Sequence, residues 1–154
     1  MEKIVNLLKE KQLTLACAES LTGGLFASSI TDVSGASKIF KGGIVSYTND
    51  AKENVLGVNH EILDSDGAIS KTCCLQMAEN AKLKFNSDIG ISFTGNAGPT
   101  ASENKPVGLV YIGISYLDKI DIFELNLKGD RKSIKNQCIS YAIDKIYDII
   151  IKDF

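Results

Sequence analysis

The stretch CAESLTGGLF, residues 17–26, places Ser20 and Thr22 just before a pair of glycines, where an apolar run gives way to a helical pattern. A glycine-containing turn between a strand and a helix can bind an anion, seat a nucleophile, or serve only as a turn. The stretch matches neither the phosphate-loop pattern with its lysine nor the dinucleotide-binding pattern. Hydrolysis of nucleoside triphosphates is therefore not expected.

If Ser20 is a nucleophile, it needs a base. The one histidine, His60, follows a predicted helix end, where we expect a solvated or capping role. A lysine can act as the base when burial or a neighbouring charge lowers its pKa, and a tyrosine can relay the proton. The stretch YTNDAK provides Tyr47 and Lys52 at a second strand-to-helix turn. They converge on Ser20 if both turns follow adjacent strands of one sheet; otherwise Lys52 is a surface lysine on an acidic helix.

A third polar turn, TGNAGP at residues 94–99, again places a hydroxyl, that of Thr94, beside glycines at the end of an apolar run. The three turns either share one edge of a sheet or are separate loops without chemistry. Four cysteines show no CxxC spacing, so with a single histidine no metal site is expected. We expect reduced thiols in the core, with a reactive Cys17 as the alternative.

The elements that would position these turns alternate between strand and helix. Helices are expected near the start of the chain, at LFASSITDV, from an Asn49 cap to Gly57, after a Ser70 cap, and from near Asp130. Strands are expected at LTLACAE, GIVSY, DIGISFTG, PVGLVYIGISY and KIDIFELNL. This order predicts an α/β fold, a three-layer α/β/α sandwich with a mixed, mainly parallel sheet, formed by residues 1–154 as one domain.

The composition is that of an ordinary globular protein, with 154 residues, 44% apolar and 23% charged residues, and a net charge of −2. Charges of both signs are interspersed, so neither nucleic acid nor a membrane is an expected partner. The first twelve residues form an amphipathic charged pattern rather than a signal peptide. We expect a cytoplasmic protein that binds a small molecule.

Six stretches together resemble the C-terminal domain of the competence/damage-inducible CinA proteins, which also occurs as a free-standing nicotinamide-nucleotide amidase. The matching stretches are AESLTGG, GGIVSYTNDAKENVLGV, DGAIS, FTGNAGP, KPVG and GDR, and they cover nearly the whole chain in the family's order. The resemblance implies a compact α/β/α domain that deamidates nicotinamide mononucleotide to nicotinic acid mononucleotide and ammonia, in pyridine-nucleotide salvage. It implies no cofactor, and self-association into a homo-oligomer is expected.

The same resemblance implies a role for each matching residue. Ser20 is the expected nucleophile, Lys52 the base, and Tyr47 a proton relay or activating partner. Arg131 is the expected cation for the substrate phosphate. The oxyanion and substrate pocket is expected to involve Thr22, Gly23, Gly24, Thr94, Gly95 and Lys105.

Two departures from the family pattern bear on these expectations. Leu21 stands where the family usually has cysteine, and the loop after Pro99 reads TASEN where the family usually has a glycine-rich stretch. The loop at residues 100–104 therefore opens two alternatives: a catalytically inactive nucleotide-binding or regulatory module, or an amidase that acts on another carboxamide.

Overall fold

The computed structural model describes residues 1–153, which form five strands and six α-helices. A short 3-10 helix, Ala36–Lys38, precedes the second strand. The strands are β1 (Leu15–Glu19), β2 (Phe40–Val45), β3 (Ile89–Gly95), β4 (Leu109–Tyr116) and β5 (Lys119–Asn126). The helices are α1 (Glu2–Lys11), α2 (Leu25–Thr31), α3 (Asn49–Asn54), α4 (His60–Ser65), α5 (Lys71–Phe85) and α6 (Arg131–Asp153).

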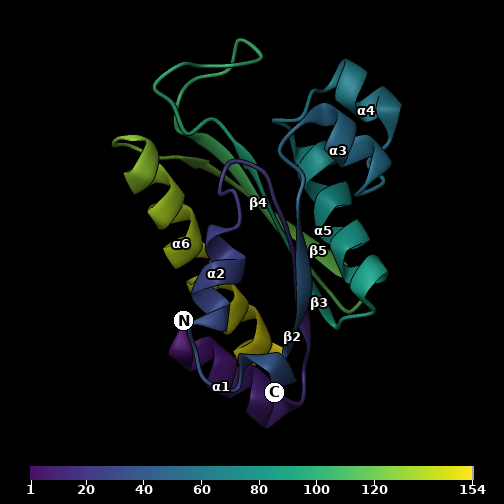
Figure 1. Ribbon diagram of the computed structural model, residues 1–154, viewed down its shortest axis with the longest axis vertical. Coiled ribbons are helices and arrows are strands. Elements are labelled where there is room, and N and C mark those ends of the chain that lie inside the picture. Colours follow the sequence, from purple (N-terminus) through teal and green to yellow (C-terminus); the bar gives the residue numbers. More distant parts are fainter. Residues whose placement is uncertain (154) are drawn as a thin grey trace.

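The strands form one mixed sheet in the order β2-β1-β3-β4-β5. The β1 strand pairs in parallel with β2 and β3, whereas β4 pairs antiparallel with β3 and β5, so that β4 alone runs opposite to the rest. Helices α1, α2 and α6 cover one face, and α3, α4 and α5 lie on the other (Figure 1). The predicted three-layer α/β/α sandwich with a mixed sheet is confirmed.

The two faces of the sheet differ in the size of their side chains. On β3, Ile91 and Phe93 belong to the large apolar cluster that α1, α2 and α6 complete. Gly90 and Ser92, which alternate with them along the strand, face α5 instead. A Cβ atom on Gly90 would collide with the carbonyl oxygen of Ala78, and Ser92 Oγ donates to the carbonyl of Cys74 at 2.7 Å. Small residues therefore let α5 pack close to the sheet.

The helix boundaries correct two of the sequence-based expectations. Thr48, not Asn49, caps α3, because Thr48 has extended backbone angles and its side chain accepts from the N–H of Ala51. The short helix α4, which begins at His60, was not predicted. Ser70 caps α5 as predicted, with its side chain accepting from the N–H of Cys73. Within residues 1–153, no helix combines the length and apolar character needed to cross a bilayer.

Candidate active site

The three polar turns lie side by side at one edge of the sheet. Glu19 at the end of β1 pairs with Val45 of β2 on one side and Phe93 of β3 on the other. Just beyond, the N–H of Ser20 donates to the carbonyl of Phe93, and the N–H of Ser46 donates to that of Glu19, both at 2.9 Å. Parallel pairing thus brings the carboxyl ends of β1, β2 and β3 together.

Lys52 reaches Ser20 from the second turn. Its Nζ lies 2.8 Å from Ser20 Oγ and 2.8 Å from the carbonyl oxygen of Ser46. The lysine side chain comes from the middle of α3, and Lys52 is only 2% exposed. The alternative of a surface lysine is therefore excluded.

Burial lowers the pKa of Lys52, while the nearby Cys73 thiol and Glu103 carboxylate act in the opposite direction. No carboxylate forms an ion pair with Lys52 among residues 1–153. A neutral amine can donate one hydrogen bond to the carbonyl of Ser46 and accept the proton of Ser20. This geometry is that of a serine with an amine base.

The dyad of Ser20 and Lys52 lies at a cavity of about 410 Å³. Six of the residues that the sequence singled out line it: Ser20, Tyr47, Lys52, Thr94, Gly95 and Arg131. The loop between β3 and β4, residues 96–108, contributes further walls and projects beyond the sheet at the end where α3 and α4 lie (Figure 1).

Tyr47 and Arg131 meet at the wall of this cavity. The Arg131 guanidinium donates to the Tyr47 hydroxyl at 2.8 Å and to the carbonyl of Gly98 at 2.7 Å. Tyr47 is 56% exposed and makes no hydrogen bond to Ser20 or Lys52. Tyr47 therefore lies at the cavity, where it contacts Arg131 and not the dyad of Ser20 and Lys52.

Thr94 and Gly95 line the cavity, and each also has a structural role. The Thr94 hydroxyl donates to the carbonyl of Ala68 at 2.7 Å, which ties β3 to the segment before α5. A Cβ atom on Gly95 would lie 2.5 Å from the carbonyl oxygen of Leu109. Gly95 is therefore required by the close approach of the neighbouring chain.

Four of the predicted pocket residues are not among those that line the cavity: Thr22, Gly23, Gly24 and Lys105. The N–H of Gly23 donates to the carbonyl of Ser20 at 3.0 Å, and both glycines have positive φ values that turn the chain into α2. Lys105 Nζ lies behind the wall, where it donates to the carbonyls of Asp66 and Ile69.

The side chain of Glu19 stabilises the turn between β1 and α2. Its buried carboxylate accepts from the N–H groups of Phe26 and Ala27, at 2.9 and 3.0 Å, in the first turn of α2. A carboxylate at a helix N-terminus satisfies donors that have no partner within the helix. Glu19 thereby fixes the chain on both sides of Ser20.

Two residues of the loop between β3 and β4 were missed by the sequence analysis. Asn96 is buried, and its side-chain amide donates to the carbonyl of Lys105 at 2.9 Å and accepts from the Ser102 hydroxyl at 2.7 Å, which closes the loop on itself. Glu103 lines the cavity. Asn96 belongs to the TGNAGP motif and Glu103 to the TASEN departure, so both stretches were noticed, but neither side chain was assigned a contact.

The family model for the CinA C-terminal domain matches residues 1–150. The chain belongs to this family. A protein of Bacillus cereus (strain ATCC 10987 / NRS 248), named as competence-damage inducible, is 50% identical over 146 residues, or 94% of this chain and 35% of that protein. A relative of the same name from Bacillus cereus (strain B4264) is 51% identical over the same shares of the two chains. The chain thus spans about a third of the length of these relatives.

Solved structures of the family share the fold. A CinA superfamily protein from Klebsiella pneumoniae 700603 superimposes with a TM-score of 0.95 at 25% identity, over 98% of this chain and 95% of that one. A competence/damage inducible protein from Agrobacterium tumefaciens gives a TM-score of 0.91 at 34% identity, over 95% and 90% of the two chains.

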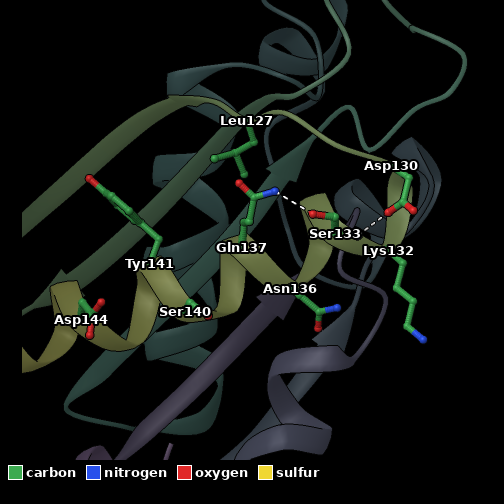
Figure 2. A pocket seen from close by; sticks show the side chains of 9 residues that line it. All are labelled: Leu127, Asp130, Lys132, Ser133, Asn136, Gln137, Ser140, Tyr141 and Asp144. Carbon is green, nitrogen blue, oxygen red and sulfur yellow. Dashed lines mark hydrogen bonds between the residues drawn. The ribbon is translucent and has the colours of Figure 1, made fainter.

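A larger hollow of about 720 Å³ lies elsewhere, along α6 and beside Leu127 (Figure 2). Its side chains bond to one another and to the backbone: Gln137 donates to the Ser133 hydroxyl at 3.0 Å and to the carbonyl of Lys128 at 2.7 Å. Among the described residues it holds no serine paired with a base. The smaller cavity at Ser20 is therefore the candidate active site.

None of the four cysteines lines the cavity at Ser20. All four are free and buried, as expected for thiols packed in the core. Burial raises the pKa of Cys73 to about 11 and that of Cys74 to about 12. Burial and the Glu19 carboxylate also raise the pKa of Cys17. The Cys17 thiol is thus held protonated, which argues against the reactive alternative.

Proposed function

We propose that the chain is a serine amidase that hydrolyses the carboxamide of nicotinamide mononucleotide to nicotinic acid mononucleotide and ammonia. The observation that carries the proposal is the buried amine of Lys52 within 2.8 Å of Ser20 Oγ at a polar cavity. Arg131 on the same wall suits a phosphate-bearing substrate. The mononucleotide and its place in pyridine-nucleotide salvage come from the family resemblance of the motifs.

In the first half-reaction, Lys52 takes the proton of Ser20 as Oγ bonds to the carboxamide carbon. The Lys52 ammonium then returns that proton to the carboxamide nitrogen, and the C–N bond breaks. Ammonia departs, and the acyl group stays on Ser20 Oγ as an acyl-enzyme. In the second half-reaction, neutral Lys52 takes a proton from water, whose oxygen attacks the acyl carbon. Ser20 Oγ leaves with that proton and frees the acid.

The oxyanion of each tetrahedral intermediate needs N–H donors. The N–H of Leu21 directly follows the nucleophile, Leu21 lines the cavity, and this N–H has no acceptor among residues 1–153. The N–H groups of Thr22 and Gly24, which also have no acceptor there, are the further donors expected for the oxyanion. The direct contact between Lys52 and Ser20 also makes a relay through Tyr47 unnecessary, which leaves Tyr47 as part of the wall that receives the substrate.

The test is ammonia release from nicotinamide mononucleotide by the pure protein. Ser20→Ala and Lys52→Ala should each lower turnover by about a thousandfold, the usual size of such losses. Lys52→Arg should lower turnover as well, because a guanidinium does not lose its proton and cannot act as the base. Lys128→Ala, at an exposed lysine outside the cavity, is the matched control. Full activity in both Ser20→Ala and Lys52→Ala would exclude the mechanism.

The loop at residues 100–104 supports a second candidate, an amidase on a different carboxamide. Thr100, Ser102 and Glu103 line the cavity, so the departure from the family pattern lies where substrate binds. Turnover of the mononucleotide compared with nicotinamide, NAD and glutamine separates the two. Binding of the mononucleotide by calorimetry without turnover of any amide would instead indicate an inactive binding module.

A further inference from the structure

Glu103 is the only carboxylate on the cavity wall among the described residues. The other ionisable groups there are Tyr47, Lys52 and Arg131. A single acid in a cavity whose fixed cation is an arginine creates two regions of opposite charge. Such a cavity complements a ligand that carries both a positive and a negative group.

The Glu103 carboxylate is held in place from two directions. Oε1 accepts from the N–H of Ala68 at 2.7 Å, and Oε2 accepts from the N–H of Ile69 at 3.0 Å. Lys105 Nζ lies 3.4 Å from Oε2 but stands behind the wall, bound to backbone carbonyls. A carboxylate has about four acceptor sites, so these contacts orient the group without using all of them.

The neighbouring backbone is shaped around this carboxylate. A Cβ atom on Gly67, which has a positive φ of 83°, would lie 2.6 Å from Glu103 Oε2, so an added side chain there would push the carboxylate aside. Glu103 and Asn104 both have positive φ values, 56° and 54°, a conformation that costs free energy in residues other than glycine. Together these features fix the Glu103 carboxylate at the turn before Lys105.

Glu103 lines the same cavity as Ser20 and Lys52. Its carboxylate acts on the pKa of Lys52 in the direction opposite to burial, and Lys52 contacts Ser20. A carboxamide that reaches Ser20 therefore places the ring that carries it within the field of Glu103.

We propose that Glu103 makes the cavity selective for a carboxamide carried on a positively charged aromatic ring. The inference rests on the proposed function, because the ring of nicotinamide mononucleotide is a pyridinium cation. Glu103 attracts the ring while Arg131 faces the phosphate, so that the zwitterion is oriented with its carboxamide toward Ser20. Glu103 is a specificity-determining residue and takes no proton in the reaction.

The test compares two ligands of the same shape. One is nicotinamide mononucleotide, and the other is its benzamide analogue, in which the ring nitrogen is replaced by carbon and the ring is neutral. Binding is measured by calorimetry in Ser20→Ala, which prevents turnover. We expect the mononucleotide to bind about tenfold more tightly than the analogue, and Glu103→Gln to bring the ratio close to one, as loss of a charge at a partly buried site predicts.

Further variants separate charge from loop structure. Glu103→Asp should keep most of the ratio, whereas Gly67→Ala should lower it by displacing the carboxylate. Lys105→Met removes the cation 3.4 Å from Glu103 Oε2 and should raise the ratio, because the carboxylate charge is then less compensated. Glu61→Gln, at an exposed carboxylate of α4, is the matched control for loss of a negative charge.

The outcomes distinguish the two proposals. Equal binding of both ligands in Ser20→Ala would overturn the role of Glu103 and leave the amidase proposal standing. An unchanged ratio in both Glu103→Gln and Gly67→Ala would overturn it as well. If neither ligand binds to Ser20→Ala, the mononucleotide is not the substrate and both proposals fall.

Discussion

The two faces of the sheet carry different kinds of side chain. The face under α1, α2 and α6 carries a continuous cluster of Ile, Leu, Val and Phe side chains. The face under α5 carries small and polar residues and a smaller apolar cluster, and the buried lysine of the dyad lies on this side. Stability is concentrated where large side chains interlock, and this leaves the second face free to hold polar groups in fixed positions.

The largest expected effect separates activity from stability on the α5 side. Lys52→Met should lower amide turnover by about a thousandfold or more while leaving the free energy of unfolding unchanged or raised. Methionine fills a similar volume without a charge whose burial costs free energy. Turnover and urea unfolding of the same samples test this. A variant that unfolds much more easily would show that the lysine is structural.

On the face under α1, α2 and α6, a substitution should lower stability and leave turnover nearly unchanged. Ile91→Ala removes a fully buried side chain from the large cluster and should lower the free energy of unfolding by about 2–5 kcal/mol. Turnover per folded molecule should change little, because Ile91 is not on the cavity wall. Urea unfolding with activity measured well below the transition checks both. A large loss of turnover in the folded protein would contradict the division between the faces.

Close packing of α5 gives a third prediction. Glycine to alanine in a strand commonly stabilises a protein by restricting its unfolded state. Gly90→Ala should instead destabilise by about 1–3 kcal/mol, because the new methyl group meets the carbonyl oxygen of Ala78. Thermal unfolding measures this, and an unchanged or higher Tm would mean that α5 does not lie so close to the sheet.

The pH dependence of stability should report Lys52 directly. Burial lowers its pKa in the folded state below the ordinary value of 10.5. Between these two pKa values the unfolded chain binds more protons, so this lysine makes stability rise with pH there. The difference in unfolding free energy between wild type and Lys52→Met should therefore shrink as pH rises toward 10.5. A difference that is constant with pH would contradict the lowered pKa.

The smallest effect concerns His60, which links the two short helices on this side. A hydrogen bond to Glu53 and the charge of Asp64 raise its pKa, with ring nitrogens 2.9 and 3.0 Å from those carboxylates. Its contribution to stability is present below the unfolded pKa and is lost as pH rises through the folded one. The single histidine gives one NMR titration curve, which should lie above pH 6.5, and His60→Gln should remove this small pH dependence.

Much of the fold could be predicted from local patterns. The alternation of apolar runs with helical stripes predicted every strand, the Ser70 cap and the long last helix. The short α4 was missed, because six residues give too little periodicity to distinguish a helix from a loop. The cap at Thr48 was misplaced by one residue because Thr and Asn both cap helices well.

The sequence by itself determined the alternation of elements, the polar residues at three strand ends and the choice of lysine over histidine as the candidate base. Only the tertiary structure decided which of those groups meet: Lys52 contacts Ser20, Tyr47 contacts Arg131, and Glu103 lines the cavity. The reason is physical. Strand periodicity fixes which face a side chain takes, but the contacts across turns depend on parallel pairing and on packing between segments far apart in the chain.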